Sequence, residues 1–228
     1  MRLIGLTGGI GMGKSTAAAA FRRARIPVFD ADAEVHALQA RGGAAVPAIA
    51  DAFPGTVRDG AVDRAALRQA VLDHAAGQQA ALARLEAIMH PLVHRAEQRF
   101  LGRARRAGRR LVVLDIPLLF ETGGDRRVDC TLVVSAPRAV QLARLRRRRQ
   151  LSREQLAAML ARQLPDQERR RRADIVVRTG LSRAHALRQL RRLITTLSRA
   201  PGTPDHRRRR LPPRRASGRP SARHTRGE

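Results

Sequence analysis

Short apolar runs of strand length alternate along the chain with longer segments that carry apolar residues at helical spacing. The runs are continuous rather than alternating, which is typical of parallel strands buried on both faces. Expected strands cover residues 2–7, 26–29, 111–115, 131–135 and 174–178. Expected helices cover residues 14–24, 32–39, 63–72, 78–107, 137–149, 152–163 and 181–198. This alternation predicts an α/β fold, a doubly wound five-stranded parallel sheet that binds its ligands at the carboxyl ends of the strands.

The interval between the second and third expected strands is too long for a simple crossover. Its pattern is mostly helical, so we interpret residues of about 60–107 as an inserted helical subdomain that holds a second substrate. Residues 1–198 then form one domain, with a helical lid over about 144–170.

A glycine-rich segment, LTGGIGMGKST at residues 6–16, follows the first expected strand and leads into an alanine-rich helix. The spacing Gly8, four residues, Gly13, Lys14, Ser15 matches the phosphate-binding motif G-x-x-x-x-G-K-[ST]. Its glycines let backbone N–H groups converge on phosphate oxygens, and the helix N-terminus adds positive potential. Lys14 is expected to reach the β- and γ-phosphates and Ser15 to bind Mg²⁺. Lys14 is the only lysine of the chain, and the bulkier guanidinium of arginine is a poor replacement there.

Acidic residues stand at the ends of two expected strands. The second strand ends in FDAD, which places Asp30 and Asp32 beside the phosphate loop. One of them is expected to cap a helix or bind metal, and Asp32 is the favoured proton acceptor for an attacking hydroxyl group. The third strand ends in Asp115, a position that supports Mg²⁺ and its waters, although Asp115 could instead cap the turn.

Two weaker signals lie in helical segments. His90-Pro91 interrupts a helical pattern, and proline bends a helix and frees backbone groups. His90 could meet a ligand there, but a histidine that caps a helix junction is the favoured interpretation. Arginines at 144 and 146–149, followed by the segment 165–169, predict two hinged helices of a closing flap. One or two of these arginines would neutralise charge during phosphoryl transfer, and the others would be solvated surface.

Composition narrows the class of protein. The chain has 228 residues, 43% of them hydrophobic, with no run long enough to span a membrane and no signal peptide before the first strand, so we expect a cytoplasmic protein. The net charge is +27, yet part of it lies in a Pro/Gly/Ser-rich segment, residues 199–228, whose composition predicts a disordered basic tail. Because Trp and Tyr are absent and the arginines are spread over many helices, we expect no specific nucleic-acid recognition. The lone Cys130 is read as a small core residue.

As a set, these residues resemble the dephospho-coenzyme A kinase family. The resemblance covers nearly all of residues 1–198 and rests on several motifs in the family's order. They are LTGGIGMGKST (6–16), VFDAD (28–32), HPLV (90–93), DIPLLFE (115–121), the arginine-rich lid, the Gln163 region and ADIVVRTG (173–180).

The resemblance implies a P-loop kinase-like fold and MgATP-dependent phosphorylation of the ribose 3′-hydroxyl of dephospho-CoA, which gives CoA and ADP. By this resemblance Asp32 matches the proposed base, Arg148 the lid arginine, and His90 a residue near the acceptor pocket. The ATP site would comprise Gly11, Met12, Gly13, Lys14, Ser15 and Thr16, with the Thr179-Gly180 turn at the adenine. Many members have Asn before that glycine, where this chain has Arg178-Thr179. A monomer is the expected state.

Three alternatives remain open from the residues. A P-loop kinase of the nucleoside monophosphate or shikimate type would share the fold, but DIPLLFE and HPLV argue against it. A binding protein that uses the loop as a nucleotide switch would not need Asp32 beside the phosphates. A nucleic-acid-binding ATPase would need its basic surface organised into a groove.

Overall fold

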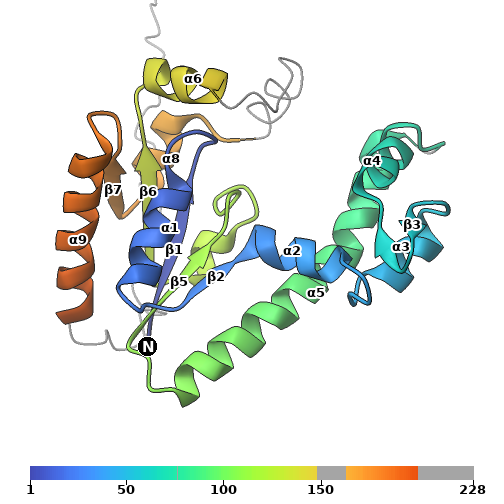
Figure 1. Ribbon diagram of the computed structural model, residues 1–228, viewed down its shortest axis with the longest axis horizontal. Helices are drawn as coiled ribbons and strands as arrows, with labels where there is room; N and C mark the ends of the chain where they lie inside the picture. Colours follow the sequence, from blue (N-terminus) through green and yellow to red (C-terminus); the bar gives the residue numbers. More distant parts are fainter. Residues whose placement is uncertain (76, 148–162, 200–228) are drawn as a thin grey trace, which may run out of the picture.

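Five parallel strands form the central sheet of the computed structural model, which describes residues 1–75, 77–147 and 163–199 (Figure 1). The strand order is β2-β5-β1-β6-β7. Their bounds are β1 (Arg2–Gly8), β2 (Val28–Asp30), β5 (Leu111–Asp115), β6 (Cys130–Ser135) and β7 (Ile175–Arg178). All residues of β5 and β6 are buried, as continuous apolar runs require. The predicted α/β fold with a five-stranded parallel sheet is therefore confirmed.

Helices cover both faces of this sheet. Their bounds are α1 (Lys14–Arg23), α2 (Ala31–Gln39), α3 (Val46–Ala52), α4 (Arg64–Leu72), α5 (Gln78–Arg106), α6 (Arg138–Arg147), α8 (Asp166–Arg172) and α9 (Arg183–Arg199), with a 3₁₀ turn at Gly124–Arg127. One core lies between α1, α9 and the sheet, and includes Val113, Leu190 and Ile194. Another core lies on the opposite face, where Val112 and Leu114 pack with Leu101 of α5. Successive residues of β5 thus face different helical layers.

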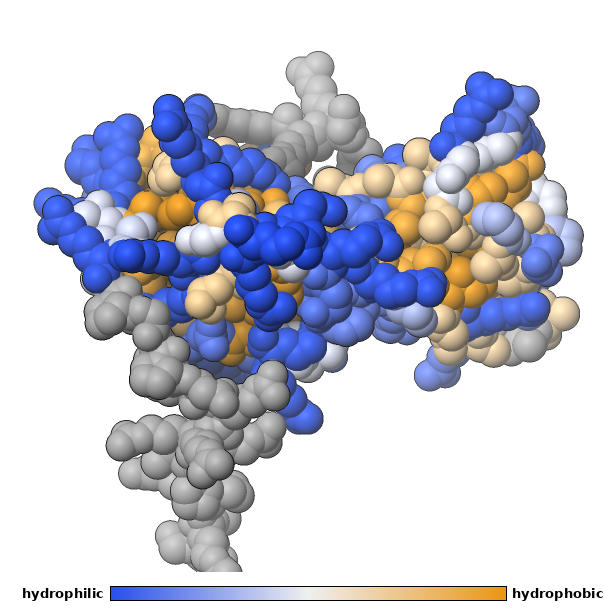
Figure 2. Space-filling view, turned by 90° about the horizontal axis from the view of Figure 1, so that it is seen from below, coloured by the Kyte–Doolittle hydropathy of each residue, from blue (hydrophilic) through white to orange (hydrophobic). Residues whose placement is uncertain are grey.

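A second unit, built mostly from helices, projects from the sheet domain (Figure 1). Its own core joins α2, α3, α4, the first half of α5 and a short hairpin of β3 (Val57–Arg58) and β4 (Ala61–Val62). This core extends from Leu38 to Met89, so the observed unit begins earlier in the chain than the expected insertion at about 60–107. Figure 2 shows a hydrophobic patch over this unit, whereas hydrophilic residues cover most of the visible sheet domain.

The long helix α5 joins the two units. Met89 packs in the core of the second unit, while Leu101 and Ala104 pack against the sheet. Pro91 lies inside this continuous helix and His90 is exposed, so the predicted helix junction with a capping histidine is wrong. Proline removes one backbone hydrogen bond, but packing at both ends of α5 holds the helix through that point.

Several expectations concern residues outside the described ranges. These are the helix over 152–163, the lid arginine Arg148, the middle of the lid and the tail beyond Arg199. Within the described ranges, no helix is both long and apolar enough to cross a membrane.

Candidate active site

The phosphate loop connects the last residue of β1 to the first residue of α1. Gly11 and Gly13 have φ values of 75° and 97°, a left-handed region that favours glycine. The Met12 N–H donates to the Gly9 carbonyl at 3.0 Å and closes a tight turn. No side chain caps the N-terminus of α1, so the N–H groups of Lys14 and Ser15 remain available to an anion, whereas that of Thr16 donates to the Gly13 carbonyl at 3.0 Å.

Lys14 extends from the start of α1 to the end of β5, where its Nζ lies 2.8 Å from Asp115 Oδ1. Asp115 is only 3% exposed. Burial raises the pKa of the Asp115 carboxyl, the attraction of Lys14 opposes this, and the charges of Asp30 and Asp32 add to the rise. One ammonium group therefore does not fully compensate the buried carboxylate, and a second cation beside it would be stabilised.

The two other carboxylates of this sheet edge have different environments. Asp30 pairs with Asp115 in the β2–β5 register, accepts the Ala33 N–H at 3.1 Å as the N-cap of α2, and binds Arg22 at 3.0 Å. Burial acts to raise the pKa of Asp30, but the hydrogen bonds from Ala33 and Arg22 outweigh it and the pKa is lowered. Asp32 is exposed in the first turn of α2, and no described residue forms a hydrogen bond or ion pair with its side chain. The cap expected for one of the two residues is thus made by Asp30.

Helix α6 and the turn after β7 hold the loop from outside. Thr179 is 5% exposed and its hydroxyl group donates to the Met12 carbonyl at 2.6 Å, while Gly180 packs against Pro137. Gln141 and Arg144 of α6 also donate to loop carbonyls. Sequence analysis missed Gln141 and treated Arg144 as part of a basic run. Their three-residue spacing puts both on one face of a helix, but the sequence alone does not show that this face meets the loop.

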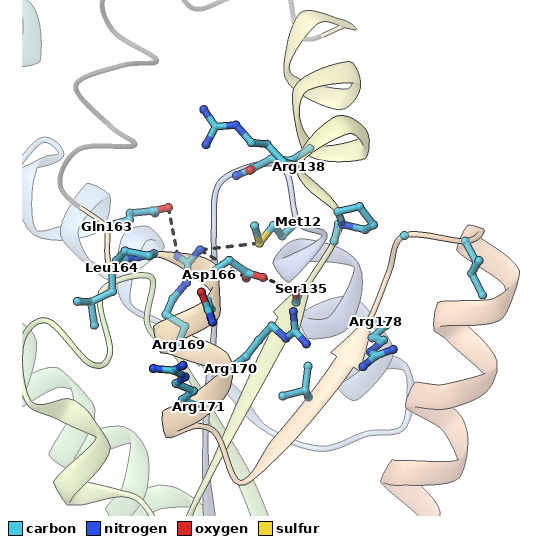
Figure 3. Close-up of a pocket in the computed structure, with 18 of the residues that line it drawn as sticks. Met12, Ser135, Arg138, Gln163, Leu164, Asp166, Arg169, Arg170, Arg171 and Arg178 are labelled. Carbon is cyan, nitrogen blue, oxygen red and sulfur yellow. Dashed lines mark hydrogen bonds and ion pairs between the residues drawn. The ribbon is translucent and has the colours of Figure 1, made fainter.

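The segment from Gln163 to Arg169 lies beside the phosphate loop, with Gln163 and Arg169 close to Met12 in Figure 3. Gln163 Oε1 accepts the Ile10 N–H at 3.3 Å and a 3.4 Å hydrogen bond from Arg169, whose guanidinium is buried. Burial lowers the pKa of Arg169, and the charges of Asp166 and Glu121 oppose that shift. An open pocket of about 1590 Å³ adjoins Arg169. Asp30, Asp32 and Asp115 do not line this pocket, but Met12 of the phosphate loop and Gly180 do, so the pocket adjoins the loop.

The geometry agrees with comparisons against known proteins. Residues 2–183 match the family model for dephospho-CoA kinase. The chain belongs to the dephospho-CoA kinase family. It is 55% identical to a dephospho-CoA kinase of Gluconobacter oxydans over 204 residues, which cover 88% of this chain and 100% of that one. It is 61% identical to that of Paramagnetospirillum magneticum over 170 residues, which cover 75% and 78% of the two chains.

Solved structures share the fold. A protein of Thermus thermophilus is 37% identical with a TM-score of 0.72, and the match covers 86% of this chain and 97% of that one. Dephospho-CoA kinase from Campylobacter jejuni, at 22% identity, has a TM-score of 0.66, with 87% and 98% covered. The resemblance inferred from the motifs is therefore confirmed. As a member of this ATP-using kinase family, the chain has dephospho-CoA kinase activity, which is the final step of coenzyme A biosynthesis.

The structure brings together most of the residues predicted for the kinase site. Lys14, Ser15, Asp30, Asp32 and Asp115 come from elements that meet at the carboxyl edge of the sheet. The remaining predicted residues differ in their placement. His90 is exposed on α5, outside this edge, the Thr179 hydroxyl is engaged by the loop, and Arg148 lies outside the described residues.

Proposed function

We propose that Asp32 accepts the proton of the ribose 3′-hydroxyl while the phosphate loop holds MgATP. The observation that carries this assignment is the division of the three edge carboxylates. Asp115 is paired with Lys14, and Asp30 is held by Arg22 and the start of α2. Asp32 is the carboxylate of this edge left without a partner among the described residues, so its oxygens are free for a substrate.

In the proposed reaction the 3′-oxygen attacks the γ-phosphorus in line and its proton passes to the Asp32 carboxylate. The bond from the γ-phosphorus to the bridging oxygen breaks, and ADP leaves with that electron pair. Lys14 lies between the loop and Asp115, where its charge stabilises the β- and γ-phosphates. Within the segment from Gly11 to Thr16, the N–H groups of Gly11, Gly13, Lys14 and Ser15 bind phosphate oxygens, because those of Met12 and Thr16 already donate to loop carbonyls.

The residues present suit a bound Mg²⁺. The hydroxyl group of Ser15 is exposed at the first turn of α1, and Asp115 is a buried carboxylate with a raised pKa beside a single ammonium group. Within the described residues no three His, Cys, Asp or Glu side chains converge on one point. Mg²⁺ is typically held by one or two protein oxygens together with phosphates and water, so a preformed cage is not required. When bound, the ion neutralises charge on the β- and γ-phosphate oxygens.

The wider assignments follow the layout of the two units. We assign the acceptor side to the helical unit and His90, the adenine to the Thr179-Gly180 turn, and charge neutralisation during transfer to Arg148 in a lid over about 144–170. A monomer is supported by the scarcity of exposed large apolar side chains in the described part of the chain, namely Met1, Leu72 and Leu181. The enzyme uses ATP, which the cytoplasm provides, so we propose a cytoplasmic location. No specific nucleic-acid partner is proposed.

An ADP-release assay with dephospho-CoA, AMP, adenosine and shikimate as acceptors tests the substrate. We expect turnover with dephospho-CoA, and ³¹P NMR of the product should show a new 3′-phosphomonoester. Faster turnover of AMP or shikimate would contradict the assignment and favour another P-loop kinase.

A further inference from the structure

Three successive carbonyl groups of the phosphate loop accept hydrogen bonds from side chains that lie outside the loop. The pairs are Gln141 Nε2 to Ile10 O at 2.8 Å, Arg144 Nη1 to Gly11 O at 3.3 Å, and Thr179 Oγ1 to Met12 O at 2.6 Å. Two of the donors come from α6 and one from the turn after β7. The outer surface of the loop is thus held at every peptide from Ile10 to Gly13.

These hydrogen bonds also fix the direction of the N–H groups on the other side of the loop. In a trans peptide the carbonyl and the next N–H point in opposite directions. A carbonyl of Ile10 drawn toward α6 therefore aims the Gly11 N–H away from α6, and the Met12 carbonyl bound to Thr179 aims the Gly13 N–H in the same way. No described residue accepts a hydrogen bond from the N–H of Gly11 or Gly13. Both N–H groups are therefore available to a ligand.

The three donors are themselves held in place. Gln141 and Thr179 are 7% and 5% exposed. Arg144 also donates to the carbonyl and the hydroxyl group of Thr179, so α6 and the β7 turn are tied to each other as well as to the loop. A glycine-rich loop has many accessible backbone conformations, and external hydrogen bonds reduce the ordering that nucleotide binding would otherwise require.

We propose that Gln141, Arg144 and Thr179 are positioning residues that hold the phosphate loop in its anion-binding shape before nucleotide arrives. They act through the loop backbone rather than by contact with the phosphates. The inference rests on the proposed function only in taking the loop as the nucleotide site. If one of these three donors is lost, the binding of ADP and the binding of ATP should weaken by the same factor, because both nucleotides use the same backbone N–H groups.

Thr179 gives the sharpest test, because Thr179→Val keeps the shape of the side chain and removes only the hydroxyl group, whereas Thr179→Ser retains it. Isothermal titration calorimetry would measure Kd for ADP and for MgATP on the full chain. Because the Thr179-Gly180 turn is also assigned to the adenine, the titration is repeated with pyrophosphate, which has no adenine, and a loss that spares pyrophosphate would overturn the proposal. We expect Thr179→Val to raise both Kd values by about tenfold, a factor in the range of one buried hydrogen bond. Thr179→Ser should stay within about twofold of wild type.

Thr56→Val is the matched control. Thr56 is 1% exposed and its hydroxyl group also donates to a backbone carbonyl at 2.6 Å, that of Phe53, but in the helical unit. Both valine variants should lose a similar amount of stability in urea, while Thr56→Val keeps wild-type Kd values. Equal Kd values in the two variants would reduce Thr179 to an ordinary structural residue and overturn the proposal.

Gln141→Leu repeats the test from the other element, with Gln98→Leu on the exposed surface of α5 as its control. We expect Gln141→Leu to weaken the binding of ADP and of MgATP together and Gln98→Leu to weaken neither. A loss confined to MgATP would mean that the side chain acts on the γ-phosphate directly, which contradicts positioning through the loop. Because the readout needs no acceptor, a failure of dephospho-CoA turnover would count against the proposed function and not against this inference.

Discussion

Replacement of Lys14 by methionine tests the ion pair between Lys14 and Asp115. The substitution retains most of the apolar stem and removes the ammonium group that lies 2.8 Å from Asp115. Removing one partner of a buried ion pair costs about 3–5 kcal/mol, because the other charge is left uncompensated. The Lys14 side chain is 17% exposed and Asp115 only 4%, so water reaches the lysine side of the pair. We therefore expect a loss at the lower end, about 3 kcal/mol at neutral pH.

The loss should depend on pH with a definite sign. Burial raises the pKa of Asp115 above its ordinary value of 3.8, although Lys14 opposes that rise. An acid whose pKa is higher in the folded state binds its proton more tightly there, so stability is greatest at low pH and falls as pH rises from 3.8 through the folded pKa. Without Lys14 the pKa of Asp115 in the folded state rises further, so stability falls over a wider pH range. The variant should recover stability toward acid.

Urea unfolding at about pH 5 and about pH 8 measures this effect in wild type, Lys14→Met, Asp115→Asn and the double variant. We expect the double variant to be more stable than Lys14→Met at the higher pH and to lack its added pH dependence. Identical pH profiles for Lys14→Met and wild type would refute the reasoning, since Asp115 would then not depend on Lys14. Turnover should be lost in Lys14→Met and also in Lys14→Arg, whose planar group does not fit the loop.

The single lysine supplies a further measurement. Selective ¹³C,¹⁵N-lysine labelling gives one lysine spin system, that of Lys14. Its side-chain signals should shift on ADP addition and in Asp115→Asn. Unchanged signals in both cases would show that the ammonium group contacts neither the nucleotide nor Asp115.

Four other changes test the remaining assignments. Asp32→Asn should lower kcat by about 10²–10⁴-fold with little change in either KM, and the same loss in Asp30→Asn instead would reverse the two roles. Asp30→Ala should cost about 1 kcal/mol as a lost cap. Because the pKa of Asp30 is lowered on folding, that contribution is present above the ordinary value of 3.8 and disappears as pH falls through the lowered pKa, which urea midpoints would show. Arg148→Ala should lower kcat at saturating substrates by at least about tenfold, roughly 1.4 kcal/mol, whereas Arg146→Ala should not; equal small effects would mark a solvated face. A chain that ends at Ser198 should unfold cooperatively and keep its kcat, and loss of cooperative unfolding would mean that the tail packs.

The sheet was predictable because its strands are buried on both faces. Runs such as LVVLD at residues 111–115 have no polar alternation, and that pattern depends on burial rather than on any distant partner. Helix α3 and the β3–β4 hairpin were missed for the opposite reason. Seven residues in α3 and two in each strand are too short to show a period, and packing in the core of the helical unit holds them.

The phosphate loop was also predictable, because its glycines and lysine are neighbours in sequence and the spacing alone encodes the geometry. The residues that hold the loop were not. Gln141 and Thr179 are separated from the loop by more than a hundred residues. Gln141 carries no motif, and Thr179, although part of ADIVVRTG, was expected at the adenine and not against the loop. Arg144 stood within a run of arginines, where nothing distinguishes an inward from an outward side chain before the helix is placed. His90 misled because a proline next to it suggested a break that tertiary packing overrides.

No described residue pairs with the Asp32 side chain, which is informative because the chain has 46 basic and only 19 acidic residues. With so many arginines, an exposed carboxylate is easily captured by a guanidinium group, as Asp30 is by Arg22. A captured carboxylate is a poor proton acceptor because the cation lowers its pKa. Asp32 instead lies in the first turn of α2, where the helix N-terminus stabilises its charge without occupying its oxygens. In the proposed function, the unoccupied Asp32 oxygens accept the proton as bond formation to phosphorus makes the attacking hydroxyl group acidic.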